Sequence, residues 1–300
     1  MKIVLPSTST RFNFPYRIIG YAGRYDTISD CAFLDDTHLV CVDRQMARMY
    51  LLEFNLDTND YTVLNEKEVL LNGTPHHFEL IYINNNTVYS VDYTNRVAIV
   101  DISNMKFDKV RWIELQEREA YHGITGITSN TLYVTNMISN IIREYNLETT
   151  KSKAIICQGG VRMKAISLID EDAVLVLSSD RGPINGIYGM KNQYNTPYNS
   201  HILVYNRHSG KLYDTYVLEK TQIDACVVQN EYCYVTCTDA CGNGYILRCK
   251  ITPEYRLTEP MRYDTDGFPH GIDIHNGLFS YTSYSESSVH IKKLSDIQFR

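Results

Sequence analysis

Long apolar runs are missing from this sequence of 300 residues. It holds no window of about 18 apolar residues, which excludes a helix that spans a membrane, and its first residues, MKIVLPSTSTRF, lack the apolar core of an export signal. We therefore expect a protein of the cytoplasm.

Basic residues are also few, since 29 Lys and Arg stand against 35 Asp and Glu, a net charge of -6. Because nucleic acids and anionic membranes require concentrated positive charge, we expect neither as a partner.

Several signature motifs of catalysis are absent as well. The chain holds no GxSxG, no HExxH and no glycine-rich phosphate loop, so covalent and phosphoryl chemistry have no support. There is no CxxC pair among the eight Cys, although five of them fall between Cys226 and Cys249. Without an export signal we expect mostly free thiols, buried in strands, rather than four disulfides.

The sequence is rich in tyrosine and in short alternating segments. Its 24 Tyr are far more than helical bundles use, and apolar and polar residues alternate with period two, as in half-buried strands. These segments recur about every 45 residues, a period typical of β-propeller blades. Six copies of a unit with four strand-like runs begin near positions 30, 77, 122, 164, 224 and 270.

The repeat predicts an all-β fold, a single six-bladed β-propeller over residues 1–300 with four-stranded blades. A pair of β-sandwiches is the alternative, which explains the strands but not the period. The sixth copy ends at Arg300 without a fourth strand, while the segment YRIIGYA (16–22) precedes the first copy. Because an open ring exposes sheet edges, we expect this N-terminal segment to join the last blade and close the ring.

The first residues of the six inner strands are expected to converge at one end of the propeller axis. In chain order they are Asp30, His76 or His77, His122, Lys164, Asp224 and His270. In the second blade the PH pair at 75–76 matches the PH pair at 269–270 and selects His76, whereas counting back from the next strand selects His77. The His and Asp residues are a ligand set for Zn, Mn, Fe or Ca, and Lys164 suits an anionic group. A water-filled channel with polar lining and a polar ligand site without metal remain as alternatives.

A second set of polar residues ends the second strand of each blade on the same face. Its members are Asp43, Asp92, Asn136 and Ser178, with Thr236 or Cys237 and Thr282 in the last two blades. Such residues cap turns through hydrogen bonds to the backbone or, around a substrate, bind it with carboxylate and amide groups. The candidate ligand-binding residues are therefore Asp30, Asp43, Asp92, Asn136 and Asp224.

An insertion, DRGPINGIYGMKNQYNTPYNS (180–200), interrupts the fourth copy on the face of the candidate histidines. Irregular loops of more than about 12 residues are usually functional or disordered, so the segment is either a lid or a loop without a role. As a lid it would bring Arg181 to an anionic group and Tyr188 to the ligand as a stacking surface, acid or base. These two residues and Lys164 are the candidate catalytic residues.

The segments HGITGI…TLYVTNMISNIIREYNL and FPHGIDI resemble six-bladed propellers with NHL-type repeats. That group is related in architecture to the gluconolactonase-type enzymes and includes the peptidylglycine amidating lyases, and PHGI also resembles blade openings of streptogramin B lyases. The resemblance to amidating lyases implies zinc ligands at His77, His122 and His270, with Arg181 as a candidate for their catalytic arginine. The Glu, Asn and Asp that hold the metal in gluconolactonase-type enzymes have no recognisable motif in this chain.

Two functions follow from these patterns. The first is the binding of a small polar ligand in an axial funnel, by a metal-dependent hydrolase, lyase or binding protein. In such a protein the metal would polarise a carbonyl group or activate water. The second is a non-catalytic scaffold that presents a propeller face to a protein partner, a role that the many tyrosines suit. Converging His and Asp side chains favour the first, whereas an exposed aromatic patch favours the second.

Overall fold

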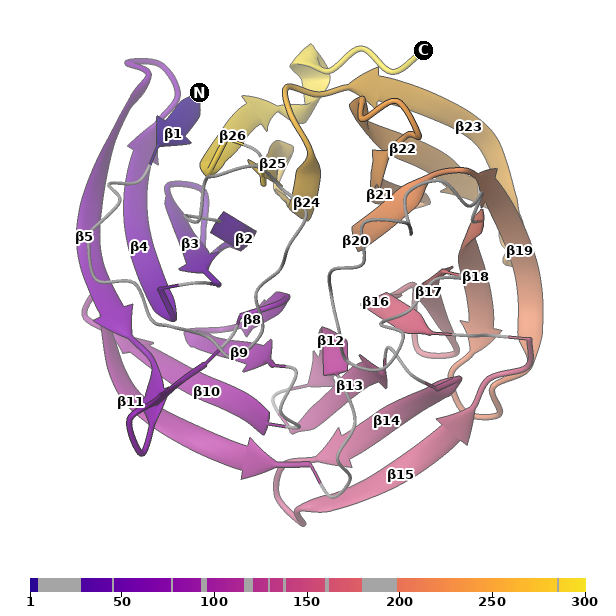
Figure 1. Cartoon of the computed structure of the whole chain (residues 1–300), viewed down its shortest axis with the longest axis horizontal. Helices are drawn as coiled ribbons and strands as arrows, with labels where there is room; N and C mark the ends of the chain where they lie inside the picture. Colours follow the sequence, from indigo (N-terminus) through magenta and orange to yellow (C-terminus); the bar gives the residue numbers. More distant parts are fainter. Residues whose placement is uncertain are drawn as a thin grey trace.

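The computed structural model describes residues 1–4, 28–44, 46–76, 78–92, 96–115, 121–128, 130–136, 139–159, 162–179, 199–284 and 286–300. Over these residues the chain forms six antiparallel four-stranded sheets around one axis (Figure 1). The sheets are the blades of a β-propeller, so the predicted all-β, six-bladed fold is confirmed. No helix in these ranges is long and apolar enough to cross a membrane.

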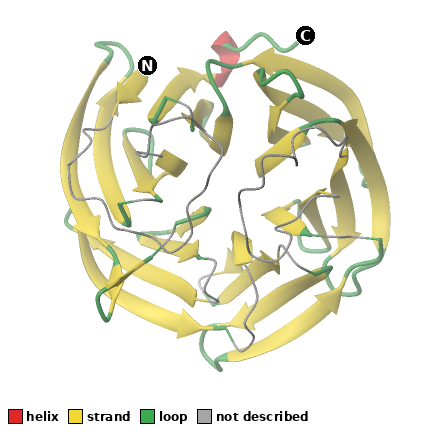
Figure 2. Ribbon diagram, in the orientation of Figure 1, coloured by secondary structure: helices red, strands yellow, loops and turns green. Residues whose placement is uncertain are grey.

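Each blade runs from an inner to an outer strand. The first three blades are β2 (Ile28–Phe33), β3 (His38–Asp43), β4 (Arg48–Asn55) and β5 (Asp60–Glu68); β8 (Ile81–Asn84), β9 (Thr87–Val91), β10 (Arg96–Ser103) and β11 (Lys106–Glu114); and β12 (Tyr121–Thr128), β13 (Thr131–Asn136), β14 (Ile141–Asn146) and β15 (Lys151–Ile156). The last three are β16 (Met163–Leu168), β17 (Ala173–Ser179), β18 (Asn199–Asn206) and β19 (Leu212–Glu219); β20 (Gln222–Gln229), β21 (Tyr232–Thr238), β22 (Gly244–Ile251) and β23 (Leu257–Asp264); and β24 (Pro269–His275), β25 (Leu278–Ser283), β26 (Ser288–Lys293) and β1 (Lys2–Val4). A hairpin of β6 (Leu70–Leu71) and β7 (Thr74–Pro75) joins the first two blades, and a 3-10 turn, Leu294–Asp296, follows β26 (Figure 2).

The N-terminal strand β1 closes the ring as the outer strand of the sixth blade. It pairs antiparallel with β26, with Ile3 opposite Val289, and the Met1 amino group donates a hydrogen bond to the Ile291 carbonyl at 2.7 Å. An N-terminal strand therefore joins the last blade as predicted. The place expected for residues 16–22 is, however, taken by Lys2–Val4, and 16–22 lie outside the described residues. Three residues are too few to show strand periodicity in a sequence.

The hydrophobic core lies between neighbouring blades. Between the first two blades, for example, Val40 and Met49 pack with Val88 and Ala98. The second strands, such as β17, are buried along their whole length because blades cover both faces, whereas outer strands such as β5 are mostly exposed. This difference explains why the second strands read as continuous apolar runs. All eight Cys are free thiols, most of them buried in these layers, as expected.

A β-bulge near the start of the inner strand directs one side chain of a blade toward the axis. The register of the inner strand shifts at five such places, between Ile28 and Asp30, Tyr121 and Ile124, Met163 and Ile166, Ile223 and Cys226, and Pro269 and Ile272. Bulges change the direction of side chains, and neighbouring backbones approach closely here. A Cβ atom at Gly123 would lie 2.5 Å from the Lys164 carbonyl oxygen, so this bulge requires glycine.

A threonine on the second strand connects the bulges of adjacent blades. The Thr236 hydroxyl accepts a hydrogen bond from the Ala225 N–H at 2.8 Å and donates one to the His270 carbonyl of the next blade at 2.9 Å. The same pair of bonds recurs at Thr135, between Gly123 and Lys164, and at Thr282, between Gly271 and Ser29. These bonds fix the backbone from which the axial side chains project.

Candidate metal and ligand site on the propeller axis

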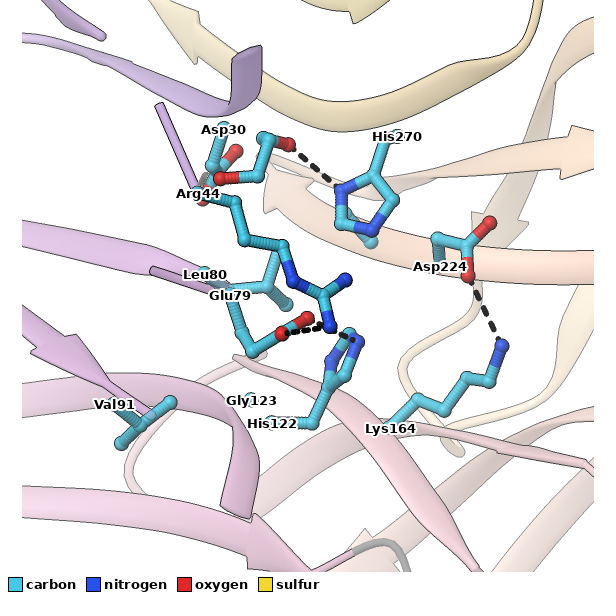
Figure 3. Close-up of polar contacts among 12 residues, drawn as sticks. Asp30, Arg44, Glu79, Leu80, Val91, His122, Gly123, Lys164, Asp224 and His270 are labelled. Carbon is cyan, nitrogen blue, oxygen red and sulfur yellow. Dashed lines mark hydrogen bonds and ion pairs between the residues drawn. The ribbon is translucent and has the colours of Figure 1, made fainter. Parts of the chain in front are cut away.

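Each of the six blades contributes one residue to the axis. In chain order these residues are Ser29, Glu79, His122, Lys164, Asp224 and His270. Ser29 belongs to this set because its carbonyl accepts the threonine hydrogen bond described above. Figure 3 shows Glu79, His122 and His270 directed toward a common region, with Lys164 and Asp224 beside it. The structure thus brings together four residues predicted from the sequence, together with Ser29 and Glu79.

Glu79, His122 and His270 form a compact group of potential metal ligands. One ligand atom of each residue lies within 4.8 Å of the others, and all three residues are buried. The Glu79 carboxylate oxygen Oε2 lies 3.3 Å from Nε2 of His122. Two imidazoles and one carboxylate are a ligand set that holds zinc or iron in proteins while leaving coordination positions open.

The two histidines of this group are held in their neutral forms. Burial lowers the pKa of His122 well below its usual range, and the nearby His270 and Lys164 lower it further. Burial also lowers the pKa of His270, although Asp224 opposes this shift. Nδ1 of His270 donates a hydrogen bond to the Ser29 carbonyl at 2.7 Å, because a carbonyl only accepts. Nε2 of the neutral His270 ring therefore carries the lone pair that binds a metal.

Arg44, in the turn after β3, extends to the same group. Its guanidinium lies 2.9 Å from Oε1 of Glu79 and donates to the Tyr284 hydroxyl at 3.4 Å. The side chain of Arg44 is only 11% exposed and that of Glu79 is fully buried. In Figure 3 the guanidinium lies beside both Glu79 and His122. A buried ion pair thus shares its carboxylate with the potential metal ligands.

Lys164 and Asp224 form a second buried ion pair next to the histidines. Nζ of Lys164 donates to Oδ1 of Asp224 and to the Ile223 carbonyl, both at 3.0 Å. The other carboxylate oxygen of Asp224 accepts a hydrogen bond from Gln222 at 2.8 Å. Although burial favours the neutral acid, the charge of Lys164 and the hydrogen bonds from Lys164 and Gln222 lower the pKa of Asp224 to about 2. The pair is therefore charged at neutral pH.

Asp30 was predicted to lie on the axis, but the axial position of the first blade is one residue earlier, at Ser29. Its carboxylate accepts hydrogen bonds from the N–H groups of Cys31, at 2.9 Å, and of Ile81 in the second blade, at 2.7 Å. Burial raises the pKa of Asp30 well above its usual range. Because of the bulge between Ile28 and Asp30, Ser29 takes the equivalent position in this blade, and its hydroxyl donates to the Val42 carbonyl at 3.3 Å. Asp30 thus connects the first two blades and takes no part in the group of potential metal ligands.

His76 is displaced from the axis in a similar way. After the β6–β7 hairpin its N–H bonds to the Val69 carbonyl, and the side chain is fully buried in the blade. Its Nδ1 lies 3.2 Å from Asp92 and its Nε2 3.4 Å from the Ser90 hydroxyl. This order resembles a catalytic triad, but Ser90 is 1% exposed and also bonds to the Leu80 carbonyl. The arrangement is a buried structural network.

The remaining predicted site residues have structural roles or lie outside the described ranges. Asp43 accepts a hydrogen bond from the Met46 N–H at 2.8 Å, and Asp92 pairs with Arg96 at 2.9 Å, so both stabilise turns after second strands. Asn136 is fully buried at the end of β13. The residues outside the described ranges are His77, Arg181 and Tyr188.

Sequence reasoning missed Glu79 and Arg44 for different reasons. The PHHF segment (75–78) resembles the PHGI segment (269–272), and this likeness aligns His76, rather than Glu79, with the axial His270. The useful signal is the distance to the first regularly paired apolar residue: Glu79 precedes Ile81 by two positions, as His122 precedes Ile124. Arg44 lies in a turn, where no periodicity marks its direction.

The fold and this group define a six-bladed β-propeller with potential metal ligands on its axis. No model of a protein family matches the sequence, and no curated protein does so either.

Many solved structures share this fold. A streptogramin B lyase matches with a TM-score of 0.57 at 11% identity, over 91% of this chain and 96% of the lyase. A chain of a nidogen/laminin complex matches with 0.63 at 12% identity, over 88% of this chain and 91% of the other. The RRP9 WD40 repeats match with 0.56 at 11% identity, over 93% and 96%. At such low identity these likenesses show the propeller fold alone.

Proposed function

We propose that Glu79, His122 and His270 bind a divalent metal ion and that the protein binds and converts a small polar ligand there, as a metal-dependent hydrolase or lyase. The observation that carries this proposal is the convergence of three ligand atoms within 4.8 Å of one another. They come from three different blades, so the tertiary fold is needed to assemble them.

The state of the imidazoles supports metal binding. A metal requires a neutral imidazole, and burial lowers the pKa of both His122 and His270. Metal-binding histidines usually donate their second N–H to a carbonyl or carboxylate, as His270 does to Ser29. Two imidazole nitrogens favour Zn, Mn or Fe over Ca, which prefers oxygen ligands alone.

The surrounding charges suit a polar ligand. A metal bound here would act as a Lewis acid and lower the pKa of a bound water molecule. Arg44 and Lys164 provide donors for an anionic or carbonyl group of the ligand, and Asp224 orients Lys164 through their ion pair at 3.0 Å. A role for Arg181 and Tyr188 in a lid over this face remains a prediction from the sequence.

Elemental analysis of the purified protein after incubation with Zn, Mn, Fe and Ca tests the proposal. We expect close to one transition-metal ion per chain in the wild type and loss of this metal in His122→Ala. The matched control is His208→Ala, because the side chain of His208 is 51% exposed, away from the axis. The control is expected to retain the wild-type metal content.

A wild-type protein that remains free of metal under these conditions would contradict the proposal. Retention of the metal by His122→Ala would contradict it as well. In either case the axial residues are channel lining, and the non-catalytic scaffold with a protein partner becomes the favoured function, to be sought by affinity capture.

A further inference from the structure

Glu79 has two competing cationic partners if the proposed function is right. In the structure its Oε1 lies 2.9 Å from the Arg44 guanidinium, while its Oε2 lies 3.3 Å from Nε2 of His122. A metal ion bound by Glu79, His122 and His270 would lie next to this guanidinium. The carboxylate that neutralises Arg44 is thus the one that the metal requires.

The guanidinium of Arg44 lies 2.9 Å from Oε1 of Glu79 and beside His122 (Figure 3), next to the place that a metal bound by the group would take. Arg44 is 11% exposed, so little water screens it, and a dication beside a buried guanidinium is strongly disfavoured unless an anion joins them. Lys164 already pairs with Asp224, so this ion pair adds no net negative charge that could offset the positive charges of the metal ion and Arg44.

We propose that the site takes a metal ion and a small carboxylate ligand together, with the ligand carboxylate replacing Glu79 as the partner of Arg44. This inference rests on the proposed function and specifies its ligand class. Arg44 already binds a carboxylate at this position, that of Glu79, and the planar guanidinium matches a carboxylate with two parallel hydrogen bonds. A ligand of this class presents its carboxylate to Arg44 and its reacting group to the metal.

Coupling between metal and carboxylate is the measurable consequence. If the ligand carboxylate compensates for the transfer of Glu79 to the metal, each partner tightens the binding of the other by the same factor. The affinity for Mn(II), measured by electron paramagnetic resonance of the free ion, is compared in chloride, acetate and sulfate. We expect acetate to tighten Mn(II) binding about fivefold or more relative to chloride, and sulfate to have a smaller effect.

Variants of Arg44 test the assignment. Arg44→Gln is expected to bind Mn(II) at least as tightly as the wild type in chloride, because a competing cation is gone, and to lose the acetate effect. Arg44→Lys, which keeps the charge that Glu79 needs for folding but lacks the planar fork, is expected to lose most of it. Arg111→Gln is the matched control, since Arg111 is 59% exposed on β11, and it should behave as the wild type.

The outcomes separate this inference from the proposed function. Mn(II) binding that acetate leaves unchanged in the wild type, or an acetate effect in Arg44→Gln and Arg44→Lys as large as in the wild type, overturns the inference but leaves the metal site standing. A larger effect of sulfate than of acetate overturns the carboxylate class. A wild-type protein that binds neither Mn(II) nor any other metal overturns both.

Discussion

Asp30 and Asp273 are buried or partly buried carboxyl groups that accept backbone hydrogen bonds across blade boundaries. Asp30 binds the N–H of Ile81 in the second blade, and Asp273 of the sixth blade binds the N–H of Phe33 in the first at 2.7 Å. Burial raises the pKa of both groups, that of Asp273 to about 7. At the residue scale, these carboxyls stabilise the propeller best in their protonated form.

This raised pKa predicts how stability changes with pH. Because the folded-state pKa of Asp273 lies above the unfolded value of 3.8, its stabilising contribution is complete below about pH 4 and is lost as the pH rises through about 7. Asp273→Asn removes this titration while keeping an oxygen that accepts from Phe33. We expect the variant to gain on the order of 2 kcal/mol of unfolding free energy relative to the wild type between pH 4 and 7, with partial exposure taken into account.

Urea denaturation at a series of pH values measures this difference. Asp172→Asn serves as the control, because the Asp172 side chain is 70% exposed. A difference between Asp273→Asn and the wild type that stays constant from pH 4 to 7 would show that Asp273 does not titrate there.

At the scale of the element, the bulged inner strand decides which side chain faces the axis. The repeat in the sequence located the inner strands, and His122, Lys164, Asp224 and His270 follow from it. The alternation of apolar residues does not reveal where a bulge lies, because the bulge adds one residue without changing the alternation that follows it. In the first blade the expected axial residue, Asp30, is one residue away from the observed one, Ser29. In the second blade, which follows the hairpin β6–β7, the observed Glu79 lies two residues after His77 and three after His76.

The threonine that joins two bulges should stabilise the fold measurably. Thr236→Val keeps the shape of the side chain but leaves the Ala225 N–H and the His270 carbonyl without their hydroxyl partner. Both groups are buried, so we expect a loss of about 1–3 kcal/mol in unfolding free energy by urea denaturation. Thr215→Val, on the exposed side of β19, is the matched control and should change stability by less than about 0.5 kcal/mol. Equal effects of the two substitutions would refute the bridging role.

At the scale of the whole molecule, the two ends of the chain complete one blade. In Figure 1, β1 borders β26, so the N-terminal strand lies in one sheet with the last three strands of the chain. The need for closure was predictable from the sixth copy, which lacked an outer strand, because an open ring exposes its sheet edges. The identity of the closing strand was not, since a strand as short as Lys2–Val4 leaves no periodic signal.

Because β1 closes the ring, we expect the stability of the whole protein to depend on apolar side chains near the N-terminus. Ile3 is fully buried against Val289 and Ile291, so Ile3→Ala should lower the unfolding free energy by about 3 kcal/mol through lost burial and the cavity left behind. The same substitution at Ile156, which is 67% exposed on β15, is the control and should have little effect. Chemical denaturation compares the two, and a stable Ile3→Ala protein would mean that β1 contributes little to the ring.

The most direct test of the central claim is anomalous X-ray scattering from crystals of the wild-type protein grown with Zn(II) or Mn(II). The account predicts one strong anomalous peak at bonding distance, about 2.0–2.3 Å, from ligand atoms of Glu79, His122 and His270. A peak elsewhere on the molecule, or none at the axis when the metal is in excess, would contradict it.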